Sequence, residues 1–447
     1  MWRPASPWTC LLIFSVLFWS IHVNWHVHQY LAANVVRQPL LLTSGEKIKQ
    51  QVKLPERRAR LNLTLGVKNW SDTNRSIAKP AKKRRKRIAV RFRAKSEMAP
   101  TCSVLREQDV DFTLTIQISW SRFWIMEHQC RRWGAHPLSL AVWIEKYKQT
   151  NQNYAESVRV SLKNMGCSLD MITVSVLKSA SARQDQYYPV NRLRNLALSQ
   201  VKSSHAIIMD ADFLVSLDLY QNLGVHRAVL AKNYTVTLVI PAFEIRSKCK
   251  PVESIRCRKF HTQTAPVNKQ ELLQLFNSGN RNGKQQIPGS TKPLLRGAKS
   301  SRAVTQSDTM IPLTIAKFHA GQSSTRYQTW ANQNANSLVP IKSMHCRYEP
   351  YVVVRYCRDT PPFQEAFTGY GKNKITWMWH LRALSYELFQ IGSAFSVHIP
   401  HKASSAYSKW KSKAWAKLKV KKIVKTFKQW MKANIPSYKM RKIRKCE

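Results

Sequence analysis

Short apolar runs and helical patterns alternate between residues 111 and 209. A run of four to eight apolar or β-branched residues predicts a strand, and apolar residues that recur every three or four positions predict a helix. Strands that alternate with helices are typical of a mostly parallel sheet covered by helices, so the expected fold class is α/β. The predicted strands are 111–119, 138–144, 171–177 and 205–209, and the predicted helices are 124–133, 154–162 and 190–202.

Two later segments have a different pattern. Residues 277–317 are rich in Gly, Ser, Lys, Asn and Gln, which predicts a long surface loop before regular structure resumes near Phe318. Residues 402–447 carry 16 Lys and Arg and a single acid, and seven of their apolar residues fall on one helical face. This basic amphipathic helix could lie on an anionic membrane, bind an acidic partner or dock on its own domain.

The net charge of the chain is strongly positive. Its 447 residues include 73 Lys and Arg against 24 Asp and Glu, a formal charge of +49. Such a charge favours polyanionic partners, which include nucleic acid, anionic lipid and acidic glycan. Much of this positive charge lies in residues 34–105, which include the continuous basic run KKRRKR at 82–87. We expect residues 34–105 to form a disordered, solvated stem. A nuclear or nucleic-acid-binding patch is the alternative.

The N-terminus carries an apolar segment. Trp8 to Val23 contains no charged side chain, although it is slightly shorter than the roughly 20 residues that a membrane span needs. It predicts either an uncleaved signal-anchor or a signal peptide cut near Ala32 and Ala33. The positive-inside rule places an excess of Lys and Arg on the cytoplasmic side of a span. The many Lys and Arg that follow this segment therefore argue against a lumenal C-terminus.

Two other features favour the lumen of the secretory pathway. Glycosylation sequons cluster in the stem, and eight of the nine cysteines follow the apolar segment. An even number of cysteines there predicts disulfides formed in an oxidising compartment, although their pairing cannot be deduced. We therefore expect a single-pass type II protein of the Golgi membrane. The sequons are at Asn62, Asn69, Asn74 and Asn233.

The predicted strand at 205–209 runs directly into Asp210-Ala211-Asp212. Two carboxylates at the carboxyl end of a buried strand can share a divalent cation, and their hard oxygen atoms suit manganese or magnesium. Such a cation could bridge the phosphates of a nucleotide diphosphate and neutralise charge on a leaving group. The alternative is a pair of aspartates that cap a helix after the strand.

Several segments then resemble, in order, the members of glycosyltransferase family 49. This family includes the LARGE-type glucuronyltransferase domain and a β-1,4-glucuronyltransferase. The resemblance covers about residues 111–403, and its core is YPVNRLRNLALSQ (188–200) followed by IIMDADFLVSLDLY (207–220). The other matching segments are TLTIQISWSRFWIMEHQCRRW (113–133), VTLVIPAFEIR (236–246), PVNKQELLQLF (266–276), YEPYVVV (348–354), FTGYGKNKITWMWHL (367–381) and VHIPH (397–401).

The resemblance implies a GT-A type fold, a UDP-sugar donor, manganese (or magnesium) and inverting transfer. By position, Asp210 and Asp212 would hold the metal and His398 would be its third protein ligand. Arg194 would pair with a phosphate or a sugar carboxylate through two hydrogen bonds. The remaining residues expected to bind the nucleotide-sugar are Gln117, Ser119, Asn191, Asn373 and Lys374.

The chain also departs from the family. Where the family has Asp-Glu-Arg-Phe, this chain has Gln364-Glu365-Ala366-Phe367. Inverting transfer needs a base for the acceptor hydroxyl, and Glu365 is the candidate, although it could instead orient Asn373 or Lys374. The lost acid and arginine motivate an alternative function, a catalytically inactive transferase-like domain that binds acidic glycans.

These observations predict four parts. Residues 1–33 would form a cytoplasmic tip and signal-anchor, 34–105 the stem, 106–403 a GT-A glycosyltransferase domain and 404–447 a basic C-terminal helix and tail. The expected function is metal-dependent, inverting transfer of a sugar, with glucuronic acid as the best candidate, from a UDP-sugar to a glycan acceptor. Nucleic acid is not the expected partner, because an apolar segment leads the chain.

Overall fold

The computed structural model describes residues 90–145, 153–179, 188–247, 249–280, 309–312 and 321–436. The chain divides into two compact units, Met1–Arg84 and Arg85–Glu447, and every described residue belongs to the second. The predicted signal-anchor, the basic run at 82–87 and three of the four sequons therefore lie outside the described residues. Within the described ranges, no helix combines the length and the apolar character that a membrane crossing requires.

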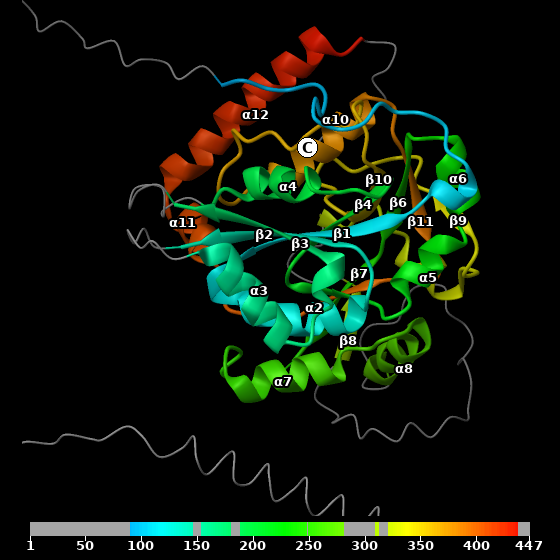
Figure 1. Ribbon diagram of the computed structural model, residues 1–447, viewed down its shortest axis with the longest axis vertical. Coiled ribbons are helices and arrows are strands. Elements are labelled where there is room, and N and C mark those ends of the chain that lie inside the picture. The colour runs from blue at the N-terminus through cyan, green and yellow to red at the C-terminus, as the bar shows by residue number, and fades with distance from the viewer. Residues whose placement is uncertain are drawn as a thin grey trace, which may run out of the picture. The chain divides into compact units, whose positions relative to one another are not determined.

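An eight-stranded mixed sheet forms the centre of the described unit (Figure 1). Its strand order is β3-β2-β1-β4-β10-β6-β11-β9, and β10 runs antiparallel to both of its neighbours. This mixed α/β architecture confirms the predicted fold class and fits a GT-A type fold. The strands are β1 (Phe112–Ser119), β2 (Leu138–Ile144), β3 (Ile172–Lys178), β4 (His205–Asp210), β6 (Val236–Ile240), β9 (Leu338–Pro340), β10 (Tyr351–Arg355) and β11 (Glu387–Ile391).

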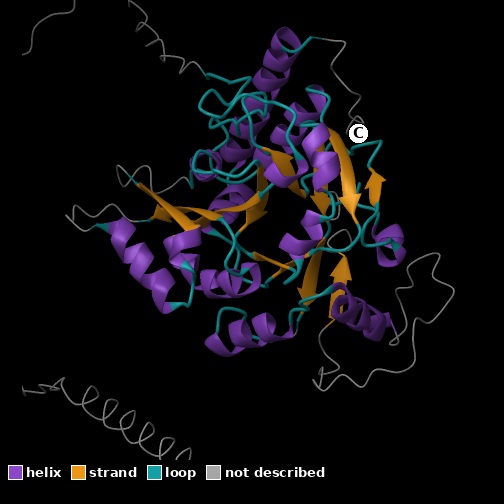
Figure 2. Ribbon diagram, turned by 45° about the vertical axis from the view of Figure 1, so that its right-hand side comes forward, coloured by secondary structure: helices purple, strands orange, loops and turns teal. Residues whose placement is uncertain are grey.

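The central strands are apolar on both sides because helices lie on either side of the sheet (Figure 2). Residues 206–209 of β4 are at most 3% exposed, which explains the unbroken apolar run in the sequence. The helices are α2 (Met126–Trp133), α3 (Tyr154–Asn164), α4 (Val190–Leu198), α5 (Leu219–Gly224), α6 (Arg227–Lys232), α7 (Ile255–Thr264), α8 (Lys269–Asn280), α9 (Tyr327–Asn332) and α10 (Asn373–Ala383).

Helix α4 ends earlier than predicted. The helix was expected over 190–202, but it stops at Leu198. The next residues form tight turns, in which the amides of Gln200 and Val201 donate to carbonyls three positions back. These turns are needed because β4 begins only seven residues after the helix ends.

A second sheet of four strands, in the order β5-β12-β7-β8, lies beyond the carboxyl end of β4. Strand β8 falls inside the predicted loop 277–317, and the last turn of α8 also enters it, so the described part of that segment has regular structure. The pairing of β8 with β7 joins residues more than sixty positions apart, which local composition cannot reveal. The strands are β5 (Phe213–Val215), β7 (Ala242–Arg246), β8 (Thr309–Pro312) and β12 (Ser396–His398).

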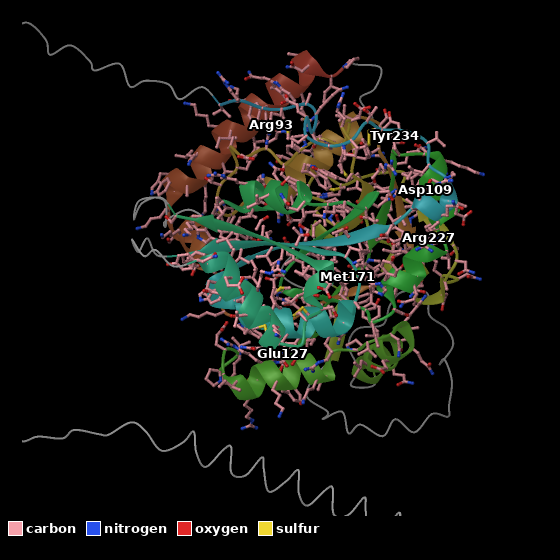
Figure 3. All side chains as sticks on the ribbon, in the orientation of Figure 1. Arg93, Asp109, Glu127, Met171, Arg227 and Tyr234 are labelled. Atoms are coloured by element: carbon pink, nitrogen blue, oxygen red, sulfur yellow. A yellow bond between two sulfur atoms is a disulfide. The ribbon has the colours of Figure 1, made fainter. Side chains whose placement is uncertain are left out.

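The end of the predicted stem packs on the domain. Cys102 forms a disulfide with Cys357, and the amide of Ser96 donates to the carbonyl of Arg358. Arg93, labelled in Figure 3, follows Phe92, whose ring lies 5.1 Å from the ring of Phe427. The other described disulfides are Cys130–Cys167 and Cys249–Cys257, so the prediction of disulfides is confirmed for these six cysteines.

The basic C-terminal segment forms α11 (Ser405–Ser412) and α12 (Ala414–Asn434). Of the three placements open from the sequence, the structure has α12 docked on its own domain. Phe427 and Met431 are buried, and the rings of Phe92, His380 and Trp430 surround Phe427. The lysines of the helix remain exposed.

Replacing Phe427 with alanine should destabilise the domain. The substitution opens a cavity beneath α12, and we expect the free energy of unfolding to fall by about 3–5 kcal/mol. Trp415→Ala on the same helix is the control, because Trp415 is 51% exposed and its loss should cost less than about 1 kcal/mol. Urea unfolding monitored by circular dichroism would measure both. Equal effects of the two substitutions would contradict the docking of α12.

Candidate active site

Three neighbouring strands bring polar side chains to the carboxyl end of β4. Strand β1 runs parallel to β4 and pairs Gln117 with Asp210. Strand β10 runs antiparallel on the other side, and its first residue, Tyr351, lies near the same end. Ligands of open α/β sheets bind at this edge, so the predicted Asp-x-Asp motif is at the expected place.

The Asp210 carboxylate is saturated with donors. Its Oδ1 accepts from Gln117 Nε2 at 2.9 Å and Arg194 Nη2 at 2.7 Å, and its Oδ2 accepts from Lys374 Nζ at 2.9 Å and Tyr351 Oη at 3.0 Å. Burial raises the pKa of Asp210, but Lys374 and Arg194 outweigh that effect and hold the pKa well below its usual range. Asp210 is therefore ionised, with two cations around it.

Arg194 and Lys374 are themselves buried charges. The guanidinium of Arg194 also donates from Nη1 to Asn191 Oδ1 and Asn373 Oδ1, both at 3.1 Å. The ammonium of Lys374 lies 3.8 Å from the centre of the Tyr351 ring. Buried charges are tolerated when they are paired and hydrogen-bonded, so α4 and α10 hold both cations firmly at the end of β4.

Asp212 has a different set of neighbours, which the second sheet supplies. Strand β12 pairs with β5 so that His398 lies opposite Phe213, and the amide of Ile399 donates to the carbonyl of Asp212. His401 Nε2 lies 2.7 Å from Asp212 Oδ2 and 3.2 Å from His398 Nε2. Candidate ligand atoms of Asp212, His398 and His401 all lie within 4.8 Å of one another.

This carboxylate and two imidazoles fit a divalent metal ion. A carboxylate oxygen suits manganese, and imidazole nitrogens suit divalent transition metals in general, so the mixed set does not select one metal. The ligand atoms converge from a turn and a strand end that hydrogen bonds hold together. Arg122 supplies positive charge there now, because its Nη1 lies 3.2 Å from Asp212 Oδ2. The guanidinium is partly exposed, and its Nη2 also contacts His401 Nδ1 at 3.1 Å and the carbonyl of Lys402 at 3.2 Å.

The protonation of this group follows from its contacts. Burial raises the pKa of Asp212, but the hydrogen bond from His401 and the positive charges around it bring that pKa below its usual range. Burial lowers the pKa of His401, yet its hydrogen bond to Asp212 outweighs this and the pKa lies above 6.5. Asp212 is therefore ionised, and its hydrogen bond with His401 favours the protonated form of that imidazole.

The structure brings most of the predicted site residues together. Gln117, Asn191, Arg194, Asn373 and Lys374 form one hydrogen-bonded network with Asp210. Asp212 and His398 belong to the adjacent group of candidate metal ligands, which does not include Asp210. Strand β5, and no helix, follows Asp212, so the two aspartates do not cap a helix.

Two predicted residues lie in other surroundings. Ser119 is partly exposed and its hydroxyl contacts that of Ser121 at 2.9 Å. Glu365 is 41% exposed, forms an ion pair with Arg93 at 3.1 Å and accepts from Asn195 Nδ2 at 2.9 Å. Their proposed contacts with nucleotide or acceptor stay predictions.

Sequence reasoning missed four residues of the site. They come from a short 3-10 helix after β1, the residues just before α4, the first position of β10 and the loop after β12. His401 was present in the matching segment VHIPH, three positions after His398, so its spacing was the available signal. The missed residues are Arg122, Tyr188, Tyr351 and His401.

Glu349 is a further carboxylate near this edge of the sheet. It lies two residues before Tyr351, and its side chain packs so closely on Gly321 that a Cβ there would meet Glu349 Oε1 at 3.1 Å. Burial raises the pKa of Glu349, while Lys374 opposes the shift and Asp210 adds to it. Glu349 therefore lies close enough to Lys374 and Asp210 to interact electrostatically with both.

The sequence matches a family profile. Residues 146–283 and 281–436 match the family described as "Glycosyl-transferase for dystroglycan", which is well over half of the chain. Similar curated proteins include "Xylosyl- and glucuronyltransferase LARGE2s" of Danio rerio, 28% identical over 71% of this chain and 34% of the relative. "Xylosyl- and glucuronyltransferase LARGE1" of Mus musculus is 26% identical over 72% of this chain and 35% of the relative. The chain thus spans about a third of the length of these relatives.

Solved structures of glycosyltransferases resemble the chain only distantly. GalNAc-T7, solved with UDP, GalNAc and Mn²⁺, has a TM-score of 0.33 at 8% sequence identity. The matched region covers 70% of this chain and 51% of the GalNAc-T7 chain. TarS of S. aureus, residues 1–349, has a TM-score of 0.30 at 8% sequence identity. The matched region covers 64% of this chain and 60% of the TarS chain.

Manganese binding to this site should weaken as the pH falls. A protonated imidazole cannot bind a metal ion, and the pKa of His401 lies above 6.5. Below that pKa, the affinity of the purified chain for Mn²⁺ should drop by up to about tenfold per pH unit for each proton released. Calorimetric titrations between pH 8 and pH 6 would measure this change.

The matched variants are Asp212→Asn and Asp170→Asn. The first removes a candidate ligand, and the second removes an exposed carboxylate from a distant turn. Binding should be lost only in the first. Mn²⁺ affinity that is independent of pH and unchanged by Asp212→Asn would show that the metal does not bind here.

Proposed function

Because this chain belongs to the glycosyltransferase family described as "Glycosyl-transferase for dystroglycan", we propose that it transfers a sugar from a UDP-sugar to a glycan acceptor. Glucuronic acid is the leading candidate for the sugar, and xylose is the second, since the relatives are named xylosyl- and glucuronyltransferases. The observation that carries the proposal is the convergence of ionised Asp210 and Asp212 with two buried cations and two histidines at one strand end.

Each side of this site has its own role. Asp212, His398 and His401 would hold manganese, with Asp210 beside them. The metal ion would stabilise the negative charge that develops on the diphosphate as its bond to the sugar breaks. Arg194 and Lys374 hold fixed positive charge close to the same place, which adds to that stabilisation without any reorganisation. Gln117 on β1 donates to the Asp210 carboxylate, and the hydroxyl of Tyr188, which precedes α4, donates in turn to Gln117 Oε1.

The transfer exchanges one bond for another. The acceptor oxygen forms a bond to the anomeric carbon, the bond from that carbon to the diphosphate breaks, and UDP leaves with the electron pair. The acceptor proton passes to a carboxylate base. Glu365 is the candidate from the sequence, and Glu349 is the candidate that burial and the fields of Lys374 and Asp210 favour.

The departure at Gln364 does not argue for an inactive domain. The side-chain amide of Gln364 donates to the carbonyl of Arg93 at 2.8 Å and accepts from the amide of Arg93 at 3.0 Å. An aspartate could not make both hydrogen bonds, so glutamine has a structural use here that is independent of the reaction.

The proposed setting is the Golgi membrane. Residues 1–33 would anchor the chain as a type II protein, with the transferase domain in the lumen. The described disulfides and the exposed sequon at Asn233 support this orientation.

Removing either aspartate of the motif should abolish transfer. We expect Asp210→Asn and Asp212→Asn to lower turnover of UDP-glucuronate or UDP-xylose by about 100-fold or more, because each loses charge next to the leaving group. A donor screen with several UDP-sugars and Mn²⁺ would first identify the substrate, and Asp170→Asn would serve as the control. Wild-type turnover in both motif variants would refute the mechanism.

The base can be identified by comparing Glu349→Gln with Glu365→Gln. We expect the first to lower kcat by about 100-fold or more while UDP binding is retained, and the second to change kcat by less than about tenfold. Initial rates at saturating donor and calorimetric UDP titrations would separate the two effects. A larger loss of kcat in Glu365→Gln than in Glu349→Gln would identify Glu365 as the base.

A further inference from the structure

An aromatic cluster lies at the edge of the candidate active site. The ring of Tyr370 is 4.9 Å from that of Tyr407 and 5.2 Å from that of Trp410, both on α11. We call these three residues the ring cluster. All three are only partly buried, so they keep exposed ring surface.

The loop that carries Tyr370 is part of the site. One residue earlier, the amide of Gly369 donates to the carbonyl of Tyr188, and four residues later Lys374 pairs with Asp210. A Cβ on Gly371 would lie 2.9 Å from Trp410 Nε1, so α11 packs directly against this loop. The ring cluster therefore borders the place where transfer is proposed to occur.

The electrostatic surroundings of Tyr370 agree with this position. Burial raises the pKa of Tyr370, and the negative charges of Glu349, Asp210 and Asp212 raise it further. The phenol thus lies within the field of the site's carboxylates.

A line of lysines leads away from the ring cluster along α12. Spacings of three and four residues put these lysines on one face of the helix, and all of them are exposed. The line is about 22 Å long at the rise of an α-helix. We call it the lysine stripe, and its members are Lys417, Lys421, Lys425, Lys428 and Lys432.

The stripe starts at the cluster and has no acidic residue near it in sequence. Lys417 Nζ lies 5.7 Å from the centre of the Trp410 ring, which makes the two features continuous. No Asp or Glu occurs between residues 402 and 446. The surface thus joins stacked aromatic rings to a row of cations that no acidic residue of the C-terminal segment neutralises.

We propose that the ring cluster and the lysine stripe bind an acidic chain of the acceptor glycan and lead its end into the active site. Carboxylates along such a chain pair with the ammonium groups, and the apolar C–H faces of its sugars pack on the aromatic rings. The proposal rests on the proposed transferase function, which it extends with an acceptor site.

An anionic membrane is a less suitable occupant. A helix that lies in a membrane interface buries its apolar face among the lipids. Here that face is turned into the protein through Phe427 and Met431, and the exposed large apolar residues of α12 are Trp415 and Leu418. The outward face is mainly ammonium groups, which suits a hydrated polyanion.

A binding experiment with the purified full-length chain tests the stripe. The probe is a hyaluronan octasaccharide, which carries a carboxylate on alternate sugars, and a dextran oligosaccharide of the same length is the neutral control. The stripe variant K417Q/K421Q/K425Q/K432Q leaves Lys428, which lies over the Trp379 ring. We expect about tenfold weaker binding of hyaluronan at physiological salt, because each exposed ion pair is worth a factor of roughly 1.5 to 5.

The matched control removes the same charge elsewhere. K163Q/K202Q/K232Q/K259Q replaces four exposed lysines outside α11 and α12 and should change the affinity by less than about threefold. Hydrogen exchange of the full chain gives a local readout that other basic segments do not affect. Added hyaluronan should protect amides of residues 405–434 in the wild type and in the control variant, but not in the stripe variant.

The ring cluster is tested by Trp410→Ala against Trp415→Ala. We expect the first to weaken hyaluronan binding by about fivefold and to raise the KM for an acidic acceptor, with donor hydrolysis in the absence of acceptor unchanged. The second should alter neither. Thermal melting of both variants checks that the fold is retained.

The outcomes separate this proposal from the transferase function. Equal binding by the stripe and control variants, or binding of dextran as tight as that of hyaluronan, would overturn the acceptor site even if transfer is observed. Protection of residues 405–434 by vesicles of phosphatidylserine and phosphatidylcholine, but not by hyaluronan, would assign the surface to a membrane instead. Absence of any transfer, with hyaluronan bound at the stripe, would overturn the transferase function while supporting the glycan site.

Discussion

The site depends on keeping two carboxylates ionised at the end of a buried strand. Burial alone would raise the pKa of both Asp210 and Asp212, so each requires positive charge close by. Asp210 has two permanent cations, Arg194 and Lys374. Asp212 has His401, which can release its proton, and Arg122, which is partly exposed. The two aspartates of the motif are therefore not equivalent: Asp210 is paired with two buried cations, whereas Asp212 is paired with a histidine and a partly exposed arginine.

This difference follows from the place of the motif between two sheets. Asp210 ends β4 in the eight-stranded sheet, and its partners come from β1, β10 and the helices that cover that sheet. The chain then turns at Asp212 and enters β5 of the smaller sheet, where β12 supplies His398. One sheet thus surrounds Asp210 with buried positive charge, and the other brings two candidate metal ligands to Asp212, two residues further along the chain.

Sequence patterns predicted the parts of this arrangement that depend on local signals. The strand at 138–144 is found with those bounds because seven consecutive residues are buried, and the Asp-x-Asp motif follows β4 as expected. The resemblance to family 49 also identified Arg194 and Lys374. Tyr351 and β8 could not be placed at the site from local patterns, because their positions depend on pairings between segments far apart in the chain. His401 was missed although it lies three residues after His398 in the matching segment VHIPH. The docking of α12 was one of three open possibilities, since an amphipathic pattern does not say what covers its apolar face.

The distribution of charge connects the two proposed sites. The cations at Asp210 are buried and paired, so little of their field reaches solution, whereas the lysines of α12 are exposed and have no acidic neighbour in the C-terminal segment. At physiological salt an exposed charge is screened over about 8 Å. The stripe therefore acts on a chain that touches it, and its length of about 22 Å lets several carboxylates bind at once. Many weak ion pairs along a track allow an acidic chain to shift its register without complete release, because breaking one exposed pair costs less than about 1 kcal/mol. Such a surface suits an acceptor whose end has to move into and out of a rigid site.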